Sequence, residues 1–132
     1  RLDGLHVLLV EDNEINQEIA KELLLMEGAS VDVADNGEQA LNIFARSEEG
    51  YYQLVLMDIQ MPVMDGYTAT AALRSLRRDD AKTAIILAMT ANVFSDDVIK
   101  AEASGMNGHI SKPFDPDKLY AMIAASCHKK RG

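Results

Sequence analysis

Short apolar runs alternate with longer stretches of helical periodicity along this chain. The apolar runs predict five strands, at residues 6–10, 31–34, 54–57, 84–89 and 109–111. The periodic stretches predict five helices: one follows Asn13, one is capped by Asn36, one starts near Gly66, one opens at Ser95 and one follows a cap at Asp115. Strands that alternate with helices in this way predict a parallel sheet with helices on both faces.

The composition of each run also predicts its place in the sheet. Runs 6–10, 54–57 and 84–89 are apolar throughout, as strands that are covered on both faces must be. Run 31–34 alternates apolar and polar residues and run 109–111 is short, so both fit the edges. The order 2-1-3-4-5 of a flavodoxin-like, doubly wound α/β fold satisfies these assignments. It predicts a ligand site at the carboxyl ends of strands one and three.

The first helix carries the clearest amphipathic pattern. Four large apolar residues fall on one of its faces at spacings of four and three: Ile15, Ile19, Leu23 and Met26. This spacing is typical of a face that packs on a core.

The length and composition indicate one globular domain. The 132 residues, of which 48% are hydrophobic and 26% charged, fit a single domain over 1–132, with a core at about 5–126 and a tail at 127–132. No apolar run approaches the roughly 20 residues that span a bilayer, so we expect no membrane insertion. The first residue is Arg1 rather than Met, so we expect a fragment or a processed chain.

The net charge and the single cysteine limit which binding partners and which cellular compartment we expect for this chain. With 13 basic and 21 acidic residues the net charge is −8, which disfavours direct nucleic-acid binding. The acidity suits cations or basic partners, although solubility alone explains it equally well. Cys127 is the one cysteine and cannot form an internal disulfide. Since no charged-then-apolar leader opens the sequence, we expect a cytoplasmic protein.

Polar residues follow the predicted strands at the edge where the ligand site is expected. They are Glu11, Asp12, Asp58, Thr90 and Lys112. Each has an ordinary alternative role, as a helix cap, a loop acid, a turn hydroxyl or a lysine that lies along apolar surface. Three carboxylates in one crevice repel one another and need a cation. An all-oxygen set without Cys or His fits Mg²⁺ or Mn²⁺ better than zinc.

Four separated motifs resemble the response-regulator receiver domain of two-component signalling. They are Glu11-Asp12, the stretch Met57–Gly66, Thr90-Ala91 and Lys112-Pro113-Phe114. The resemblance extends from about Leu5 to Ile123. The residues around Asp58 and the stretch Asp12–Asn16 are most similar to those in receivers of hybrid sensor histidine kinases.

This resemblance implies a role for each matching residue. Asp58 is the implied phosphoacceptor, and the implied Mg²⁺ ligands are Asp12, Asp58, the Gln60 backbone carbonyl and, through water, Glu11. Lys112 and Thr90 would each contact a phosphoryl oxygen. The implied partner is a phosphohistidine on a histidine kinase or a histidine phosphotransfer domain. The domain would catalyse only its own phosphorylation and dephosphorylation, and whether the parent chain is a hybrid sensor kinase stays open.

The resemblance also implies a conformational switch, in which Thr90 moves toward the phosphate and a residue on the fifth strand turns inward. The matching position is His109, where tyrosine or phenylalanine is more usual. An exposed histidine on an edge strand is the alternative. A weak homodimer also stays open.

Three other functions have specific sequence requirements. A flavin or nucleotide module needs a donor-rich phosphate loop after strand one, where residues 11–14 are Glu, Asp, Asn and Glu. An aspartate-based phosphatase commonly carries Asp-x-Asp, but position 60 is glutamine. A phosphorylation-independent protein-interaction module of the same fold stays open, although it has no need for Asp58, Thr90 and Lys112.

Overall fold

The five predicted strands form one parallel sheet. The computed structural model describes residues 3–59, 64–90, 103–111 and 115–131, without the side chains of 111 and 127–131. The strand order β2-β1-β3-β4-β5 is the predicted one. The strands are β1 (His6–Val10), β2 (Ser30–Ala34), β3 (Leu54–Asp58), β4 (Ile85–Thr90) and β5 (Gly108–Ser111).

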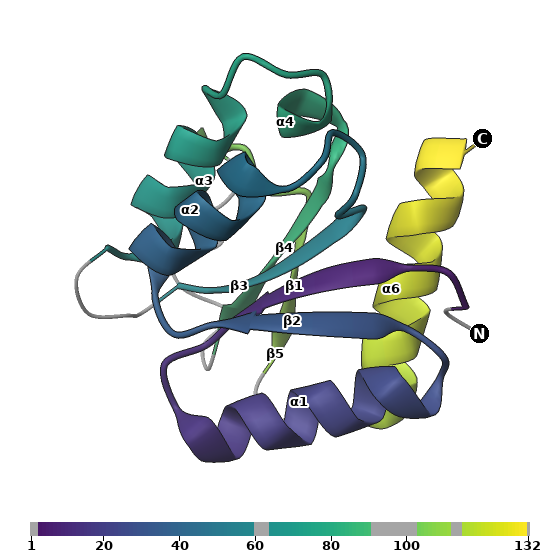
Figure 1. The fold of residues 1–132 in the computed structure, drawn as a ribbon. Coiled ribbons are helices and arrows are strands. Elements are labelled where there is room, and N and C mark those ends of the chain that lie inside the picture. The colour runs from purple at the N-terminus through teal and green to yellow at the C-terminus, as the bar shows by residue number, and fades with distance from the viewer. Residues whose placement is uncertain (1–2, 60–63, 91–102, 112–114, 132) are drawn as a thin grey trace.

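Helices cover both faces of the sheet. The described helices are α1 (Glu14–Met26), α2 (Gly37–Arg46), α3 (Gly66–Arg74), α4 (Asp80–Thr83) and α6 (Pro116–Arg131). Figure 1 shows α1 and α6 on one side and α2 and α3 on the other. The one-turn α4 was not predicted, because four residues are too few for a periodic pattern. The predicted helix that opens at Ser95 lies outside the described residues.

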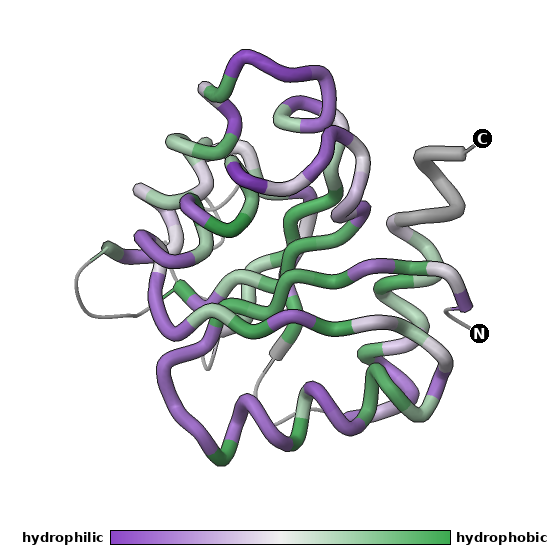
Figure 2. The backbone as a smooth tube through the Cα atoms, in the orientation of Figure 1, coloured by the Kyte–Doolittle hydropathy of each residue, from purple (hydrophilic) through white to green (hydrophobic). Residues whose placement is uncertain are grey.

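The core consists of two apolar layers, one on each face of the sheet. Alternate residues of a strand belong to different layers: Val55 and Met57 pack toward α2 and α3, and Leu54 and Leu56 toward α1 and α6. The strands accordingly form the hydrophobic centre of the molecule in Figure 2. β1, β3 and β4 are almost completely buried, whereas β2 alternates between exposed and covered positions. The predicted division into central and edge strands is therefore confirmed.

Side-chain caps fix where three helices begin. Asn13, Asn36 and Asp65 each accept a hydrogen bond from the backbone N–H three residues later, at 3.0, 2.9 and 2.8 Å. The predicted cap at Asn36 is thus confirmed. Because the caps at Asn13 and Asn36 lie three and two residues beyond the carboxyl ends of β1 and β2, they also fix the loops that follow these two strands.

The prediction that four large apolar residues of α1 pack on the core is wrong for three of them. Ile15, Ile19 and Met26 are exposed by 70%, 46% and 68%, and the buried residues of the helix are Ala20 and Leu24. Ala20 and Leu24 are four residues apart and pack into the layer shared with α6. Of the predicted face, Leu23 is half-buried and packs against this same layer, whereas Ile15, Ile19 and Met26 point toward solvent.

The C-terminal helix continues to the end of the described chain. The backbone of α6 is helical as far as Arg131, which includes all but the last residue of the predicted tail at 127–132. Leu119 and Ile123 are fully buried against the sheet, as the helical spacing predicts. Among the described residues, no helix combines the length and apolar character needed to cross a bilayer.

Candidate acidic site

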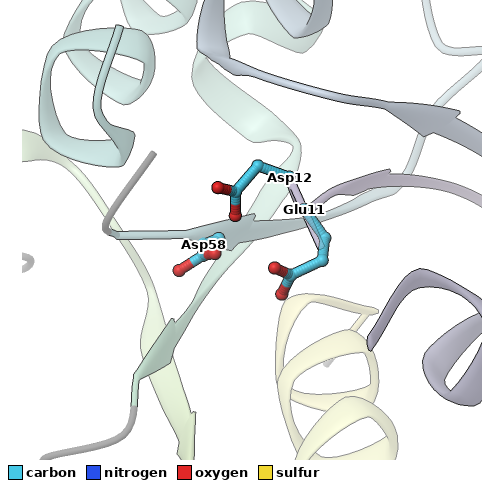
Figure 3. Close-up of side chains that lie close together, drawn as sticks. All are labelled: Glu11, Asp12 and Asp58. Carbon is cyan, nitrogen blue, oxygen red and sulfur yellow. The ribbon is translucent and has the colours of Figure 1, made fainter. Parts of the chain in front are cut away.

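Three carboxylates meet at the carboxyl ends of β1 and β3. Glu11 and Asp12 follow β1 directly, and Asp58 is the last residue of β3. One carboxylate oxygen from each residue lies within 4.8 Å of the other two, and the three side chains converge on one region in Figure 3. The two strands are neighbours, with Val10 paired to Met57, so their ends lie at the same level.

Backbone and side-chain hydrogen bonds hold Glu11 in place. This residue is only 1% exposed. Its N–H donates to the Ala34 carbonyl at 3.1 Å, and one of its carboxylate oxygens accepts from the Asn13 N–H at 3.2 Å. The Glu11 carbonyl accepts from the Gln17 side-chain amide at 2.5 Å. Asp12, in contrast, is exposed.

Asp58 is held by the start of α3. Asp58 is buried, with only 5% of the residue exposed. The Gly66 N–H donates to the Ile59 carbonyl at 3.0 Å. A Cβ atom on Gly66 would overlap the Asp58 carbonyl oxygen and lie 2.9 Å from the Ile59 Cα. The sequence analysis did not predict this contact, and its only local signal is a glycine placed directly after the helix cap Asp65.

Thr90 and His109 lie on one face of the sheet. Thr90 ends β4 and is 6% exposed, one residue beyond Met89, which pairs with Asp58. His109 is half-buried and pairs with Ala88, two residues before Thr90. Residues that pair between parallel strands share a face, as do residues two apart. The two predicted switch residues are therefore on the same side of the sheet.

Two predicted site residues, Gln60 and Lys112, lie outside the described residues. The geometry therefore brings together Glu11, Asp12 and Asp58, and it places Thr90 on the strand next to Asp58.

The cluster suits a small hard cation. All of its ligand atoms are carboxylate oxygens, the type that Mg²⁺ prefers. Two oxygens on opposite sides of a Mg²⁺ ion are about 4.2 Å apart. Carboxylate oxygens that are up to 4.8 Å apart can bind the same ion only if the side chains move slightly closer together, or if a water molecule lies between one carboxylate and the ion.

A family model for the response regulator receiver domain matches residues 7–124. The chain belongs to the response regulator receiver domain family. It is accordingly a receiver domain of two-component signalling, with the fold and the acidic cluster that the sequence pattern predicted.

Relatives of this receiver domain occur in several settings. Hybrid signal transduction histidine kinase I of Dictyostelium discoideum is 37% identical over 119 residues, which are 89% of this chain but 7% of that protein. The receiver domain of sensor histidine kinase PA1611 from Pseudomonas aeruginosa is 33% identical, with a TM-score of 0.85 over 95% of this chain and 98% of that one, and it holds a magnesium ion in its active-site cleft.

A third relative was solved with a partner. The receiver domain of Ssk1 from Saccharomyces cerevisiae was crystallised with the histidine phosphotransfer protein Ypd1. It is 32% identical to this chain, with a TM-score of 0.85 over 98% of this chain and 94% of that one.

Proposed function

We propose that this receiver domain takes a phosphoryl group from a phosphohistidine onto Asp58 in a Mg²⁺-dependent reaction and then loses it by slow hydrolysis. The observation that carries the proposal is the cluster of Glu11, Asp12 and Asp58, whose oxygens lie within 4.8 Å of one another. The magnesium ion in the cleft of the PA1611 receiver supports a divalent ion at this site.

The transfer is a nucleophilic substitution at phosphorus. A carboxylate oxygen of Asp58 bonds to phosphorus while the bond from phosphorus to the histidine ring nitrogen breaks. The ring nitrogen keeps the electron pair and takes up a proton from water, and Asp58 becomes an acyl phosphate. A bound Mg²⁺ ion would offset the negative charge of the carboxylates and of the phosphoryl oxygens.

Neighbouring residues orient the reacting groups. Glu11, Asp12 and the Gln60 backbone carbonyl are the proposed additional ligands, with Glu11 acting through water. The Thr90 hydroxyl donates to one phosphoryl oxygen, and Lys112 pairs with another. Because the transition state is loose, these contacts act by positioning and by charge neutralisation.

A conformational switch follows phosphorylation in this proposal. Thr90 moves toward the phosphate, and His109 turns inward behind it on the same face of the sheet. Addition of beryllofluoride and Mg²⁺ should therefore shift the backbone amide resonances of both residues. An unmoved His109 would remove this residue from the switch.

Intact-mass measurement after incubation with acetyl phosphate tests the acceptor. We expect a gain of one phosphoryl group that EDTA and Asp58→Asn abolish. The control Asp79→Asn removes an exposed acid at the far end of the sheet and should leave the gain unchanged. A persistent adduct on Asp58→Asn would move the acceptor elsewhere. No adduct on the wild-type domain would favour a phosphorylation-independent interaction module.

We further propose that a histidine phosphotransfer partner docks on the exposed face of α1. The Ssk1 receiver binds such a partner, which supports this class of protein here. The apolar residues Ile15, Ile19 and Met26 are exposed, and Ile15 lies only three positions after Asp12. In Figure 2, hydrophobic segments of α1 reach the lower outer edge of the molecule. A protein that brings a histidine to Asp58 must cover surface next to the acid cluster, and this face offers apolar contact area there.

Transfer from phosphorylated Ypd1 tests this docking face separately from the chemistry. Ile15→Glu should slow transfer from Ypd1 about tenfold or more, because a buried charge replaces an apolar contact. Its phosphorylation by acetyl phosphate should not change. The matched control Ala71→Glu places the same charge on an exposed position of α3, across the sheet. Equal transfer rates for both variants would exclude α1 as the docking face.

We also propose a cytoplasmic location for the domain. The one cysteine cannot form an internal disulfide, which fits a reducing compartment.

A further inference from the structure

The acidic site is assembled from two separate loops. Glu11 and Asp12 belong to the loop after β1, whereas Asp58 is fixed by the start of α3. Within the sheet, the pairing of β1 with β3 connects these two parts of the site. A second connection runs outside the sheet, through the first turn of α2, which lies beside α3 (Figure 1).

One end of this connection is a pair of side-chain hydrogen bonds. The Gln17 amide donates to the Glu11 carbonyl at 2.5 Å and to an Asp35 carboxylate oxygen at 2.9 Å. The Asp35 N–H donates to the Gln39 side chain at 2.9 Å, and the Gln39 N–H donates to the Asn36 cap at 2.9 Å. These hydrogen bonds therefore connect the loop after β1 to the first turn of α2.

The other end is a close backbone contact. The Gly37 N–H donates to the Met64 carbonyl at 3.3 Å. A Cβ atom on Gly37 would lie 2.6 Å from that oxygen and 2.9 Å from the Ala69 Cβ, so only glycine fits without a shift. Met64 lies two residues before Gly66, which packs on the Asp58 backbone. The first turn of α2 thus sets the position of the segment that holds Asp58.

We propose that Gln17, Asp35 and Gly37, here called the α2 bridge, are positioning residues that set the spacing between the two parts of the acidic site. The inference rests on the proposed Mg²⁺-dependent function of that site. Outer-shell contacts of this kind orient metal ligands and change metal affinity by about tenfold or more. The α2 bridge therefore controls Mg²⁺ affinity, and it acts without touching the ion.

A matched pair of substitutions at Asp35 tests the bridge. Asp35→Asn and Asp35→Ala remove the same charge, but only asparagine keeps an oxygen that can accept from Gln17. Mg²⁺ affinity is measured by titration calorimetry, and phosphorylation by acetyl phosphate is measured across Mg²⁺ concentrations. We expect Asp35→Ala to bind Mg²⁺ about tenfold more weakly than Asp35→Asn. Its phosphorylation rate should recover at saturating Mg²⁺.

A second comparison separates positioning from stability. Gly37→Ala should weaken Mg²⁺ binding by a similar factor, because its methyl group pushes Met64 away. Gly50→Ala is the control: its φ of +84° strains an alanine, but nothing lies within 4 Å of the added Cβ and the residue precedes β3 at the other end of the sheet. It should lower the urea midpoint and leave Mg²⁺ affinity unchanged.

The outcomes distinguish this inference from the proposed function. If the wild-type domain neither binds Mg²⁺ nor accepts a phosphoryl group, the proposed function fails. If it does both and the two Asp35 variants bind Mg²⁺ equally, the α2 bridge is refuted and the function stands. Should Gly37→Ala fail to fold, the exposed Asp35 still decides the question.

Discussion

Arg78 is the residue whose removal we expect to destabilise the fold most clearly without touching the acidic site. Its guanidinium forms a two-point pair with Asp80, with nitrogen–oxygen distances of 2.6 and 2.8 Å. The two side chains are only 14% and 7% exposed. The same guanidinium donates to the Phe44 and Ser47 carbonyls at the end of α2, both at 2.9 Å, and lies 5.0 Å from the Phe44 ring centre.

The size of the effect follows from what Arg78→Ala leaves behind. Asp80 would keep its hydrogen bond from the Gly50 N–H at 2.8 Å but lose its only described cation. Removing one partner of a buried ion pair costs about 3–5 kcal/mol. Because Gly50 still contacts the carboxylate, we expect the lower end, about 3 kcal/mol, which is about 150-fold in the unfolding equilibrium.

The charge on Asp80 gives this pair a pH dependence. Burial alone would raise the pKa of Asp80, but hydrogen bonds from Arg78 and from the Gly50 N–H outweigh burial and lower it. A lowered pKa in the folded state contributes stability above the unfolded pKa of about 3.9, and that stability is lost as the pH falls. The cost of Arg78→Ala should accordingly shrink in acid.

Urea denaturation of four proteins measures the pair. Arg78→Ala, Asp80→Ala, the double variant and the exposed neighbour variant Arg77→Ala are compared with wild type. Arg77→Ala should stay within about 0.5 kcal/mol of wild type. The double variant should be clearly more stable than the sum of the two single changes predicts, since no buried charge is left alone. Equal midpoints for Arg78→Ala and Arg77→Ala, or strictly additive effects, would refute the reasoning.

Substitutions at Thr70 and Tyr52 test two hydroxyl groups. Thr70 is fully buried and its hydroxyl has no hydrogen-bond partner among the described residues, so Thr70→Val should raise the thermal midpoint, with a gain of about 1 kcal/mol that Thr70→Ser does not share. Tyr52 donates to Asp32 at 2.6 Å, and burial together with this bond raises the pKa of Tyr52. That raised pKa contributes stability below about pH 10 that is lost at higher pH, so the urea midpoint should fall less steeply above pH 10 in Tyr52→Phe than in wild type.

The sequence predicted the features that depend on local patterns. β1, β3 and β4 are apolar runs because both faces of these strands are covered, and Asn36 caps a helix in the structure as its type and place suggest. The acidic residues could be assigned to one edge of the sheet because the ends of parallel strands converge there. These conclusions need only the period of the pattern and the topology.

Contacts between distant segments could not be predicted in this way. The period of α1 gave one apolar face, but whether Ile15 or Ala20 meets the sheet depends on how closely the helix approaches it. Arg78 bonds to the end of α2, more than thirty positions away, and nothing near it in the sequence points to that segment. A glycine after a helix cap does not by itself identify the contact of Gly66 with Asp58, since that contact arises only when α3 packs on the end of β3.

The acidic site itself should reduce the stability of the fold. Three carboxylates within 4.8 Å repel one another, and two of the residues, Glu11 and Asp58, are buried. Asp58→Asn removes one of these charges, so we expect it to stabilise the domain in EDTA by about 1 kcal/mol or more. Mg²⁺ should remove this difference in stability, because a bound ion at ten times its dissociation constant raises the free energy of unfolding of the binding protein by about 1.4 kcal/mol. Urea midpoints in EDTA and in Mg²⁺ measure the carboxylate repulsion and the stabilisation by the ion. Asp79→Asn is the exposed control. If Asp58→Asn is instead less stable in EDTA, the Asp58 carboxylate contributes to folding through favourable contacts, and its position at the strand end no longer requires a functional explanation.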